Sequence, residues 1–299
     1  MRPAHTVVGL GEILWDMLPS GRQIGGAPAN FAYCSHLLGE KAVVASRVGE
    51  DLLGQEIRDR LTKAGISDHF LQADDLHPTG TVQVQLDDAG QPKFEITRDV
   101  AWDFLEWTDE WQRLAREADA VCFGSLAQRS AHSRNTIRKF LDSTLPNTLR
   151  IFDVNLRQTF YSAEIVSESL QRANVVKLNH EEVPKVRDLL ALSDATDLSL
   201  CKSLIKRFDL KVVCVTRGAQ GSLLCDRITA HEQPGFPVKV KDTVGAGDAF
   251  TAALVDGLLQ EHSLAHINES ANRLGAWVAS QPGGMPKPPV DGIAKLLIV

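Results

Sequence analysis

Short apolar runs alternate with amphipathic segments along most of this chain. The runs consist largely of apolar and β-branched residues and fall at 6–10, 42–48, 120–123, 151–154, 175–178 and 212–216. Strands of this composition are typically buried on both faces, and the amphipathic segments between them are typical of helices that connect parallel strands. The alternation therefore predicts an α/β fold in which helices cover both faces of a mainly parallel sheet.

The connecting segments near the N-terminus show the helical pattern most clearly. Residues 29–38 and 53–64 have helical spacing of apolar side chains, and they end at Gly39 and Gly65. Glycine commonly follows the last turn of a helix because it adopts the left-handed conformation there without strain. We therefore expect helices over both segments.

One stretch departs from the alternation and predicts a hairpin. Residues 80–86 alternate apolar and polar side chains, 87–92 carry turn residues, and 93–98 continue as a second strand. This pattern is typical of a hairpin exposed on one face. No linker rich in glycine, serine or proline separates it from the rest, so we expect a flap on a single domain that spans 1–299.

The composition narrows the class of partner. The chain has 299 residues, of which 43% are hydrophobic and 23% charged, and this is ordinary for a globular protein. Its net charge of −6 argues against nucleic acid or an anionic membrane, because both require a basic face. Five scattered cysteines without a Cys-x-x-Cys pair fit a reducing compartment, and no apolar stretch reaches the ~18 residues of a membrane span. We expect a cytoplasmic protein with a small-molecule ligand.

A glycine-rich turn near the C-terminus points to phosphate chemistry. Asp242-Thr243-Val244-Gly245-Ala246-Gly247-Asp248 leads directly into a helical segment that continues to residue 259. Gly245 and Gly247 let backbone N–H groups turn toward one point, where the helix adds its positive dipole end. Beside a phosphate bound there, Asp248 can take a proton from an attacking hydroxyl, which indicates phosphoryl transfer. The alternative is an ordinary loop with a helix-capping aspartate.

The common nucleotide-binding signatures are missing from the sequence. No Gly-x-x-x-x-Gly-Lys-Ser/Thr motif occurs, which argues against a P-loop enzyme. Gly9 and Gly11 follow the first apolar run, but Leu14 stands where a dinucleotide fingerprint has its third glycine. A dehydrogenase of that type is therefore not favoured.

Three motifs, in the same order along the chain, resemble the signatures of the PfkB, or ribokinase-like, carbohydrate kinases. They are Gly25-Gly26-Ala27-Pro28-Ala29-Asn30, Asn179-His180-Glu181-Glu182 and the segment 242–248. The resemblance covers nearly the whole chain, and residues 11–16, 25–32 and 100–103 are similar to the fructokinase branch. It implies a ribokinase-like three-layer α/β/α domain with a small β-sheet lid from approximately 12–25 and 80–100.

The resemblance implies a sugar site in the first third of the chain. Asp16 follows the first strand, where its carboxylate accepts sugar hydroxyls. Gly25 and Gly26 permit close approach of the backbone to the sugar, and Asn30 both donates and accepts hydrogen bonds. Arg98, at the end of the predicted flap, faces the sugar or the transferring phosphate. Without the resemblance, Asp16 and Arg98 read as solvated surface residues.

The resemblance assigns a second group of residues to ATP and its ions. Glu182 is implied to hold Mg²⁺ through water, and Asp242 to belong to a monovalent-cation site for K⁺. The implied nucleotide contacts are Asn179, Thr216, Gly218, Gly221, Gly245, Gly247 and Asn272. From the residues alone, Asn179 is a helix cap, Glu182 a first-turn acid and 216–221 a hairpin turn.

The reaction implied by the resemblance is direct transfer of the γ-phosphate of ATP to a sugar hydroxyl, with fructose as the leading substrate. Asp248 contacts that hydroxyl and removes its proton, while N–H groups around Gly245, Ala246 and Gly247 stabilise the moving phosphoryl group. Ribose, 2-keto-3-deoxygluconate, tagatose phosphate and nucleosides stay open as substrates, as does a catalytically silent sugar-binding regulator. The exposed hairpin is a template for association, so we expect a homodimer.

Overall fold

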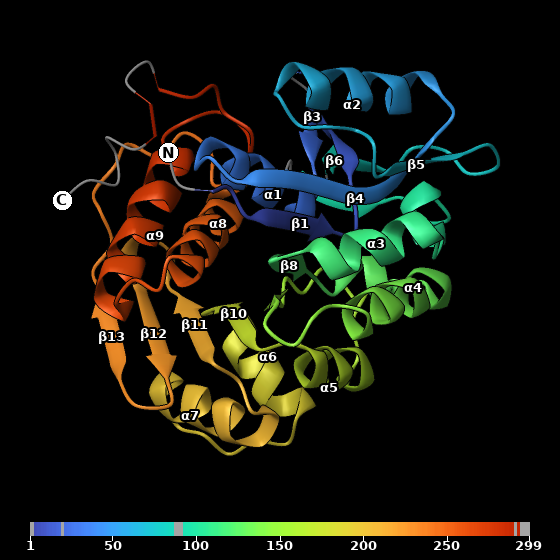
Figure 1. The fold of residues 1–299 in the computed structure, drawn as a ribbon. Helices are drawn as coiled ribbons and strands as arrows, with labels where there is room; N and C mark the ends of the chain where they lie inside the picture. The colour runs from blue at the N-terminus through green and yellow to red at the C-terminus, as the bar shows by residue number, and fades with distance from the viewer. Residues whose placement is uncertain (1–2, 19–20, 87–91, 290–291, 294–299) are drawn as a thin grey trace.

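A nine-stranded sheet runs through the described part of the molecule in the order β13-β12-β11-β10-β9-β8-β1-β4-β5 (Figure 1). The computed structural model describes all residues except 1–2, 19–20, 87–91, 290–291 and 294–299. The strands are β1 (Thr6–Leu10), β4 (Lys41–Gly49), β5 (Leu71–Asp74), β8 (Ala120–Phe123), β9 (Leu149–Asp153), β10 (Val175–Asn179), β11 (Val212–Thr216), β12 (Ser222–Asp226) and β13 (Ala230–Gln233). All neighbouring pairs from β11 to β5 are parallel, whereas β12 and β13 are added antiparallel.

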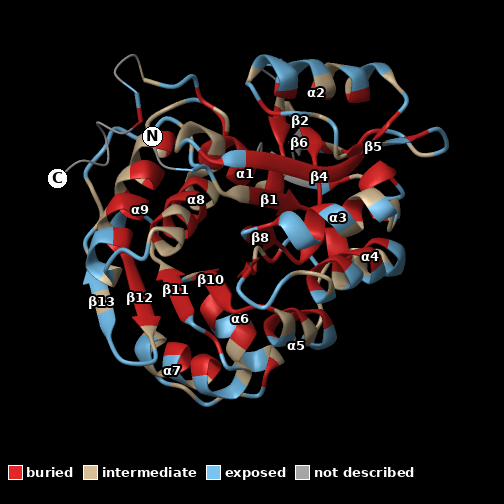
Figure 2. Ribbon diagram, in the orientation of Figure 1, coloured by how far each residue is buried: buried red, intermediate tan, exposed pale blue. Residues whose placement is uncertain are grey.

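Helices cover both faces of this sheet because successive strand residues point to opposite sides. Val7 of β1 belongs to one apolar core and its neighbour Val8 to the other. The first core contains side chains of α1 (Ala27–Leu37), α2 (Leu52–Lys63), α8 (Ala246–Leu259) and α9 (Leu264–Ala279). The second contains side chains of α3 (Asp109–Glu117), α4 (Ala131–Asp142), α5 (Ala163–Arg172), α6 (Glu182–Leu189) and α7 (Asp197–Phe208). Figure 2 shows the central strands of this sheet buried and the outer helix faces exposed, which confirms the predicted three-layer α/β/α fold.

A second, smaller sheet has four strands in the order β3-β2-β6-β7. They are β2 (Leu14–Leu18), β3 (Gly21–Gly25), β6 (Thr81–Leu86) and β7 (Pro92–Ile96). β6 and β7 form the predicted hairpin, and β2 lies parallel to β6. β7 ends at Ile96, so the predicted second strand is shorter at its end than 93–98 and Arg98 lies beyond it. The predicted turn at 87–92 lies, apart from Pro92, outside the described residues.

The predicted helices form, but they begin earlier than expected. α1 starts at Ala27 because Pro28 is favourable in a first turn, where its missing N–H has no partner to lose. α2 starts at Leu52 because the Asp51 carboxylate caps it by accepting from Gly54 N at 2.7 Å. A proline and a capping carboxylate were therefore better boundary signals than apolar spacing.

Two glycines of the first strand are explained by packing. A Cβ on Gly9 would lie 2.0 Å from Pro28 O, so only glycine lets the start of α1 lie against β1. Gly11 has φ +143, and its Cβ would lie 3.1 Å from the Pro28 ring. These glycines position α1, whose Asn30 enters the site described next. Three short 3₁₀ turns complete the connections: η1 (Ala101–Phe104), η2 (Leu126–Arg129) and η3 (Gly218–Gln220).

Candidate active site

Polar residues gather at the carboxyl ends of the parallel strands, where a sheet of this kind opens its ligand crevice. Asp153 ends β9, Asn179 ends β10 and Thr216 ends β11. Asp248 enters the same region from α8, because it lines one small cavity together with Asp153. The fold thus brings together residues that lie far apart in the sequence.

The glycine-rich turn adopts the geometry of an anion site. Gly245 precedes α8 with φ 76, a left-handed conformation, and a Cβ there would lie 2.4 Å from Gly284 Cα. No side chain among the described residues caps α8, so N–H groups of its first turn stay available for an anion. Ala246 N donates to Thr243 O at 3.3 Å, so that N–H already takes part in the turn. The predicted cradle is therefore carried by Gly247 and Asp248 more than by Ala246.

Asp248 is held at the start of α8 as a carboxylate that titrates near neutrality. Asn30 Nδ2 donates to Asp248 Oδ2 at 2.8 Å. Burial and the charge of Asp153 raise the Asp248 pKa to about 6, against the opposing effects of Asn30, Lys177 and Arg157. A carboxylate with this pKa is ionised at neutral pH and still basic enough to accept a proton.

Of the predicted sugar residues, Asp16 lies on β2 and Gly25, at the end of β3, lies against its carboxylate. Burial raises the pKa of Asp16 to about 6, while Arg157 lowers it and Asp242 raises it. A Cβ on Gly25 would lie 2.3 Å from Asp16 Oδ2, so glycine leaves room for this carboxylate. Gly26 precedes α1 with φ 105, and its Cβ would lie 2.5 Å from Glu12 O. Both glycines are thus required by close contacts inside the protein.

Asn30 was predicted to bind the sugar, and in the structure its side chain binds Asp248. Its amide nitrogen binds Asp248, and its Oδ1 is buried without a hydrogen-bond partner in the described part of the chain. A Cβ on Gly284 would lie 2.7 Å from the Asn30 amide, which places the 283–284 turn against this residue. Asn30 therefore orients Asp248 and keeps an acceptor for one further donor.

Asp242 fixes the glycine-rich turn to the C-terminal segment. Its Oδ1 accepts from Val244 N and its Oδ2 from Gly283 N, both at 3.0 Å. A Cβ on Gly283 would lie 2.7 Å from Gln23 Oε1 of β3. Asp242 thus joins the turn, the 283–284 segment and the small sheet, and each of its oxygens keeps one lone pair for a cation.

Asn179 and Glu182 bind the backbone around the ends of β9 and β10. Asn179 Oδ1 accepts from Glu181 N and Glu182 N at 3.0 Å, as a helix cap does. Glu182 accepts from Leu156 N and Asn179 N, both at 2.8 Å, and its side chain is buried. Burial raises the pKa of Glu182 above its ordinary value. Within the described ranges no three acidic, histidine or cysteine side chains form a metal-binding group.

The turn after β11 is a hairpin turn that leaves one glycine facing open space. Arg217 N donates to Gly221 O at 2.7 Å, and β12 returns antiparallel. Gly218 has φ +55 and nothing within 4 Å of the position of its Cβ, whereas a Cβ on Gly221 would lie 1.9 Å from Gln233 O. Arg217 is bound to Asp197 at 2.9 Å, so its charge is already paired. Of the predicted nucleotide contacts in this turn, Gly218 is exposed and Thr216 is partly exposed.

Two further predicted contacts lie at the margins of the site. Asn272, on α9, is buried and donates from Nδ2 to Ser222 Oγ at 2.6 Å. Arg98 is exposed, and its guanidinium lies 5.0 Å from the centre of the Phe160 ring. Neither is placed against Asp248 by any contact of the described residues.

Three charged residues at this edge were missed or left unassigned by the sequence reasoning. Lys177 lies in β10 and pairs with Asp153 at 3.1 Å, both buried. Arg157 is exposed, and its charge acts on Glu12, Asp16 and Asp248. The signals were a lysine inside an apolar strand and an arginine shortly after β9.

Glu12 is a further acid of this site that has no assigned role in the sequence reasoning. It is 1% exposed, and its Oε2 has no hydrogen-bond partner among the described residues. Burial raises its pKa to about 7, and Asp248 raises it further while Arg157 and Arg129 oppose the shift. Its position shows that Asp248 has acidic neighbours on more than one side.

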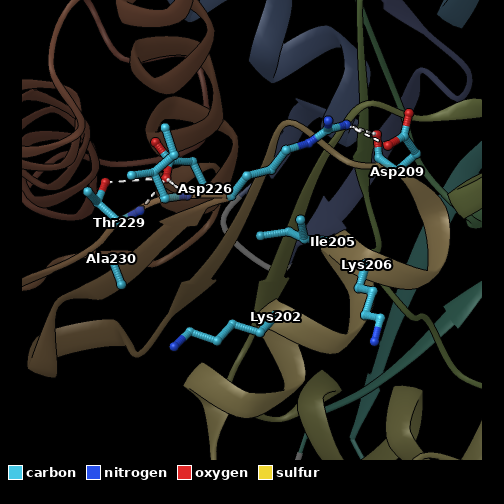
Figure 3. A pocket seen from close by; sticks show the side chains of 9 residues that line it. Lys202, Ile205, Lys206, Asp209, Asp226, Thr229 and Ala230 are labelled. Carbon is cyan, nitrogen blue, oxygen red and sulfur yellow. Dashed lines mark hydrogen bonds and ion pairs between the residues drawn. The ribbon is translucent and has the colours of Figure 1, made fainter.

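A larger cavity lies away from this site, at the amino end of β11 (Figure 3). Its volume is about 580 Å³, and α7 and the β12–β13 turn line it. Lys202 and Lys206 point along its wall, while Arg227 is paired with Asp209 at 2.6 Å. Asp226 Oδ1 accepts from Thr229 N at 2.6 Å, which closes the strand turn.

Comparisons with known proteins identify the family of this chain. The profile of the pfkB family of carbohydrate kinases matches residues 21–290. The chain is similar to the fructokinase of Escherichia coli, with 32% identity over 92% of this chain and 94% of that protein. It is also similar to the fructokinase of Salmonella typhimurium, with 34% identity over 83% of each.

Solved structures share the fold over nearly the whole chain. A sugar kinase of Pyrococcus horikoshii has a TM-score of 0.84 at 28% identity and covers 98% of this chain and 96% of its own. A fructokinase of Vibrio cholerae O395, solved with fructose, ADP and calcium ion, has a TM-score of 0.79 at 25% identity and covers 99% of both chains. In the described ranges, no helix is long and apolar enough to cross a membrane.

Proposed function

This chain belongs to the pfkB family of carbohydrate kinases, and we propose that within this family it acts as a fructokinase, transferring the γ-phosphate of ATP to a hydroxyl of D-fructose. The observation that carries the proposal is Asp248, a carboxylate oriented by Asn30 at the uncapped start of α8. The relatives called fructokinase, and the neighbour solved with fructose and ADP, support the choice of sugar.

In the proposed reaction, Asp248 acts as the general base. Its carboxylate takes the proton of the sugar hydroxyl while the hydroxyl oxygen bonds to the γ-phosphorus. The bond from that phosphorus to the bridging oxygen breaks, and ADP leaves. The N–H groups of the first turn of α8 stabilise the negative charge of the moving phosphoryl group, and the turn ordered by Gly245 directs them.

The sugar is proposed to lie between Asp16, Asn30 and Asp248. Asp16 accepts from sugar hydroxyls, and the unpartnered Asn30 Oδ1 accepts from one more. Arg157 supplies a cation near both Asp16 and Asp248. Gly25 and Gly26 are proposed to let the backbone lie close to the sugar. Arg98, which follows β7, is proposed to approach the sugar or the transferring phosphate. We further propose that the small sheet acts as a lid on one domain.

ATP is proposed to run from the start of α8 toward the turn after β11. Asn179, Thr216, Gly218 and Asn272 lie on that side, and Gly221 shapes the turn from within. Mg²⁺ would be held by the phosphates and by Glu182 through water, and it would neutralise phosphate charge.

We also propose a K⁺ site at Asp242 and a homodimer formed through the small sheet. The five free cysteines support a further proposal, that the protein is cytoplasmic.

A substrate panel tests this function. ADP formation from ATP and Mg²⁺, with K⁺ present, is measured for the purified protein with fructose, ribose, glucose, 2-keto-3-deoxygluconate and adenosine in parallel. We expect fructose to give the highest kcat/KM. A higher kcat/KM for another substrate would change the sugar and keep the kinase, as the similarity to the Pyrococcus horikoshii sugar kinase allows. Absence of ADP formation with every substrate tested would contradict the proposal and favour the catalytically silent sugar-binding regulator.

A further inference from the structure

We propose that Lys177 and Asp153 form a buried ion pair that controls the ionisation of Asp248, and that the two act as positioning residues for phosphoryl transfer. The inference rests on the proposed function for the reaction that it serves. The effect of the two buried charges on the ionisation of Asp248 can be measured without enzyme turnover.

The pair is built into the sheet. Asp153 and Lys177 are direct partners across the parallel strands β9 and β10. Lys177 Nζ donates to Asp153 Oδ1 at 3.1 Å, and the residues are 6% and 3% exposed. Removing two charges from water is costly, so their retention at this place calls for a reason beyond packing.

Contacts of Thr251 and Gly247 connect the pair to the first turns of α8. Thr251 Oγ1, one turn after Gly247, lies 3.0 Å from Asp153 Oδ2 and 2.9 Å from Gly247 O. A Cβ on Gly247 would lie 3.0 Å from Lys177 Nζ. The ammonium group therefore lies directly beside the backbone that is proposed to hold the phosphoryl group, and adds positive potential there.

Asp153 and Asp248 face one enclosed space. Both line a cavity of about 10 Å³ whose other walls are Ala27, Pro28, Phe31, Cys122, Phe123 and Gly124. This volume holds at most about one water molecule, so little solvent screens the two carboxylates from each other. Asp153 should therefore oppose ionisation of Asp248, and Lys177 should favour it.

The Asp248 pKa reflects this balance. Burial and Asp153 raise it to about 6, and Asn30, Lys177 and Arg157 limit the rise. Other titratable or charged groups act on Asp248 or on Lys177 from the elements around them. These groups are Glu12 after β1, Cys34 of α1, Cys122 of β8 and Glu182 of α6.

The experiment measures the ionisation of Asp248 directly. Full-length protein labelled with ¹³C at aspartate carboxyl groups is titrated by NMR, and the Asp248 resonance is assigned by its loss in Asp248→Asn. We expect Asp153→Asn to lower the midpoint by about 1 pH unit and Lys177→Met to raise it by about 1 pH unit, because a neighbouring charge shifts a carboxyl pKa by this order. The acidic limb of kcat should move the same way in each variant.

Matched controls separate this effect from a change in net charge. Asp209→Asn and Lys202→Met make the same substitutions at exposed positions around the cavity of Figure 3. Neither should move the midpoint. The double variant Asp153→Asn/Lys177→Met removes both charges of the pair together and should return the midpoint to within about half a pH unit of the wild type. This variant and Asp153→Asn keep the test valid where Lys177→Met alone does not fold.

The outcomes separate this inference from the function on which it rests. Midpoints that stay fixed, or that move in the same direction in folded Asp153→Asn and Lys177→Met, would overturn the inference even if fructose is phosphorylated. Opposite shifts in a protein that phosphorylates no sugar would uphold the ion-pair effect and reject the proposed function. A pair that only stabilises the fold would change the melting temperature and leave the Asp248 midpoint unchanged.

Discussion

At the carboxyl ends of β9 and β10, Asp153 and Lys177 are nearly closed off from solvent, whereas at the amino end of β11 the charged Asp209 and Lys202 are exposed. Each region has an acid and a base: Asp153 and Lys177 lie on neighbouring strands, and Lys202 and Asp209 lie in and at the end of α7. In the first region the pair lies in a low-dielectric interior and acts strongly on a third group, Asp248. In the second, water screens each charge, and surface pairs such as Arg227 with Asp209 contribute little.

The larger of the two cavities is the one without buried charged groups among its described residues. The exposed region has a cavity of about 580 Å³, and the space between Asp153 and Asp248 is about 10 Å³. The smaller one is lined by two carboxylates, Asp153 and Asp248, and Asp153 carries the buried ion pair with Lys177. Here the environment of the charged groups, and not the size of the hollow, indicates where chemistry is possible.

The largest contrast between the regions should come from removing one carboxylate in each. Asp248→Asn should lower kcat by ~10² to 10⁴ with little change in sugar KM, because a general base acts mainly on the transition state. Asp209→Asn, at an exposed helix end, should leave both values unchanged. Steady-state kinetics with fructose and ATP measures both. Near-normal kcat in Asp248→Asn would remove this residue from the role of base.

A second contrast compares two glycines with left-handed backbone. Gly245→Ala should lower kcat by about 10- to 100-fold, because its Cβ would lie 2.4 Å from Gly284 Cα and displace the anion turn. Gly39 also has a positive φ, +93, but nothing lies within 4 Å of its Cβ position. Gly39→Ala should cost about 1 kcal/mol of stability and leave kcat intact. Kinetics and urea unfolding of both variants test this, and equal kcat losses would contradict the packing argument.

The smallest expected effect is on stability. Burial raises the Asp248 pKa from 3.8 to about 6, so the folded state binds this proton more tightly than the unfolded state does. The wild type therefore loses stability relative to Asp248→Asn as the pH rises from about 4 to about 6. At pH 7 the variant should be more stable by about 1–2 kcal/mol, after allowance for the partial exposure of the group. Urea unfolding at pH 4.5 and pH 7.5 measures the difference in free energy of unfolding between the two proteins. A difference that is the same at both pH values would contradict this prediction.

The sequence pattern predicted the parts of the fold that have a strong periodic signal. β8 and β11 were found because their residues are apolar on both faces. β13, Ala230–Gln233, was missed because it is polar and only partly buried at the sheet edge. An edge strand of this kind is fixed by its partner β12 and gives no apolar pattern of its own.

The site was predictable to the extent that backbone geometry and local spacing define it. The spacing of Gly245, Gly247 and Asp248 predicts an anion turn before a helix, and in the structure Gly245 has a left-handed backbone directly before α8. The pairing of Lys177 with Asp153 depends on the register of two strands, over a separation of 24 residues. A lysine in an apolar strand does indicate a buried partner, but only the fold identifies it.

The pH dependence of fructose-stimulated ADP formation tests the central claim most directly. The wild-type kcat/KM for fructose is measured from pH 5 to 8 at a fixed, subsaturating concentration of ATP and Mg²⁺, with Asp209→Asn beside it. A base with a pKa of about 6 in the free protein must be ionised to accept the hydroxyl proton, so kcat/KM should rise with pH and reach half its maximum near pH 6 in both proteins. A kcat/KM that stays constant down to pH 5, or ADP formation that does not depend on the sugar, would contradict the assignment of this site to phosphoryl transfer through Asp248.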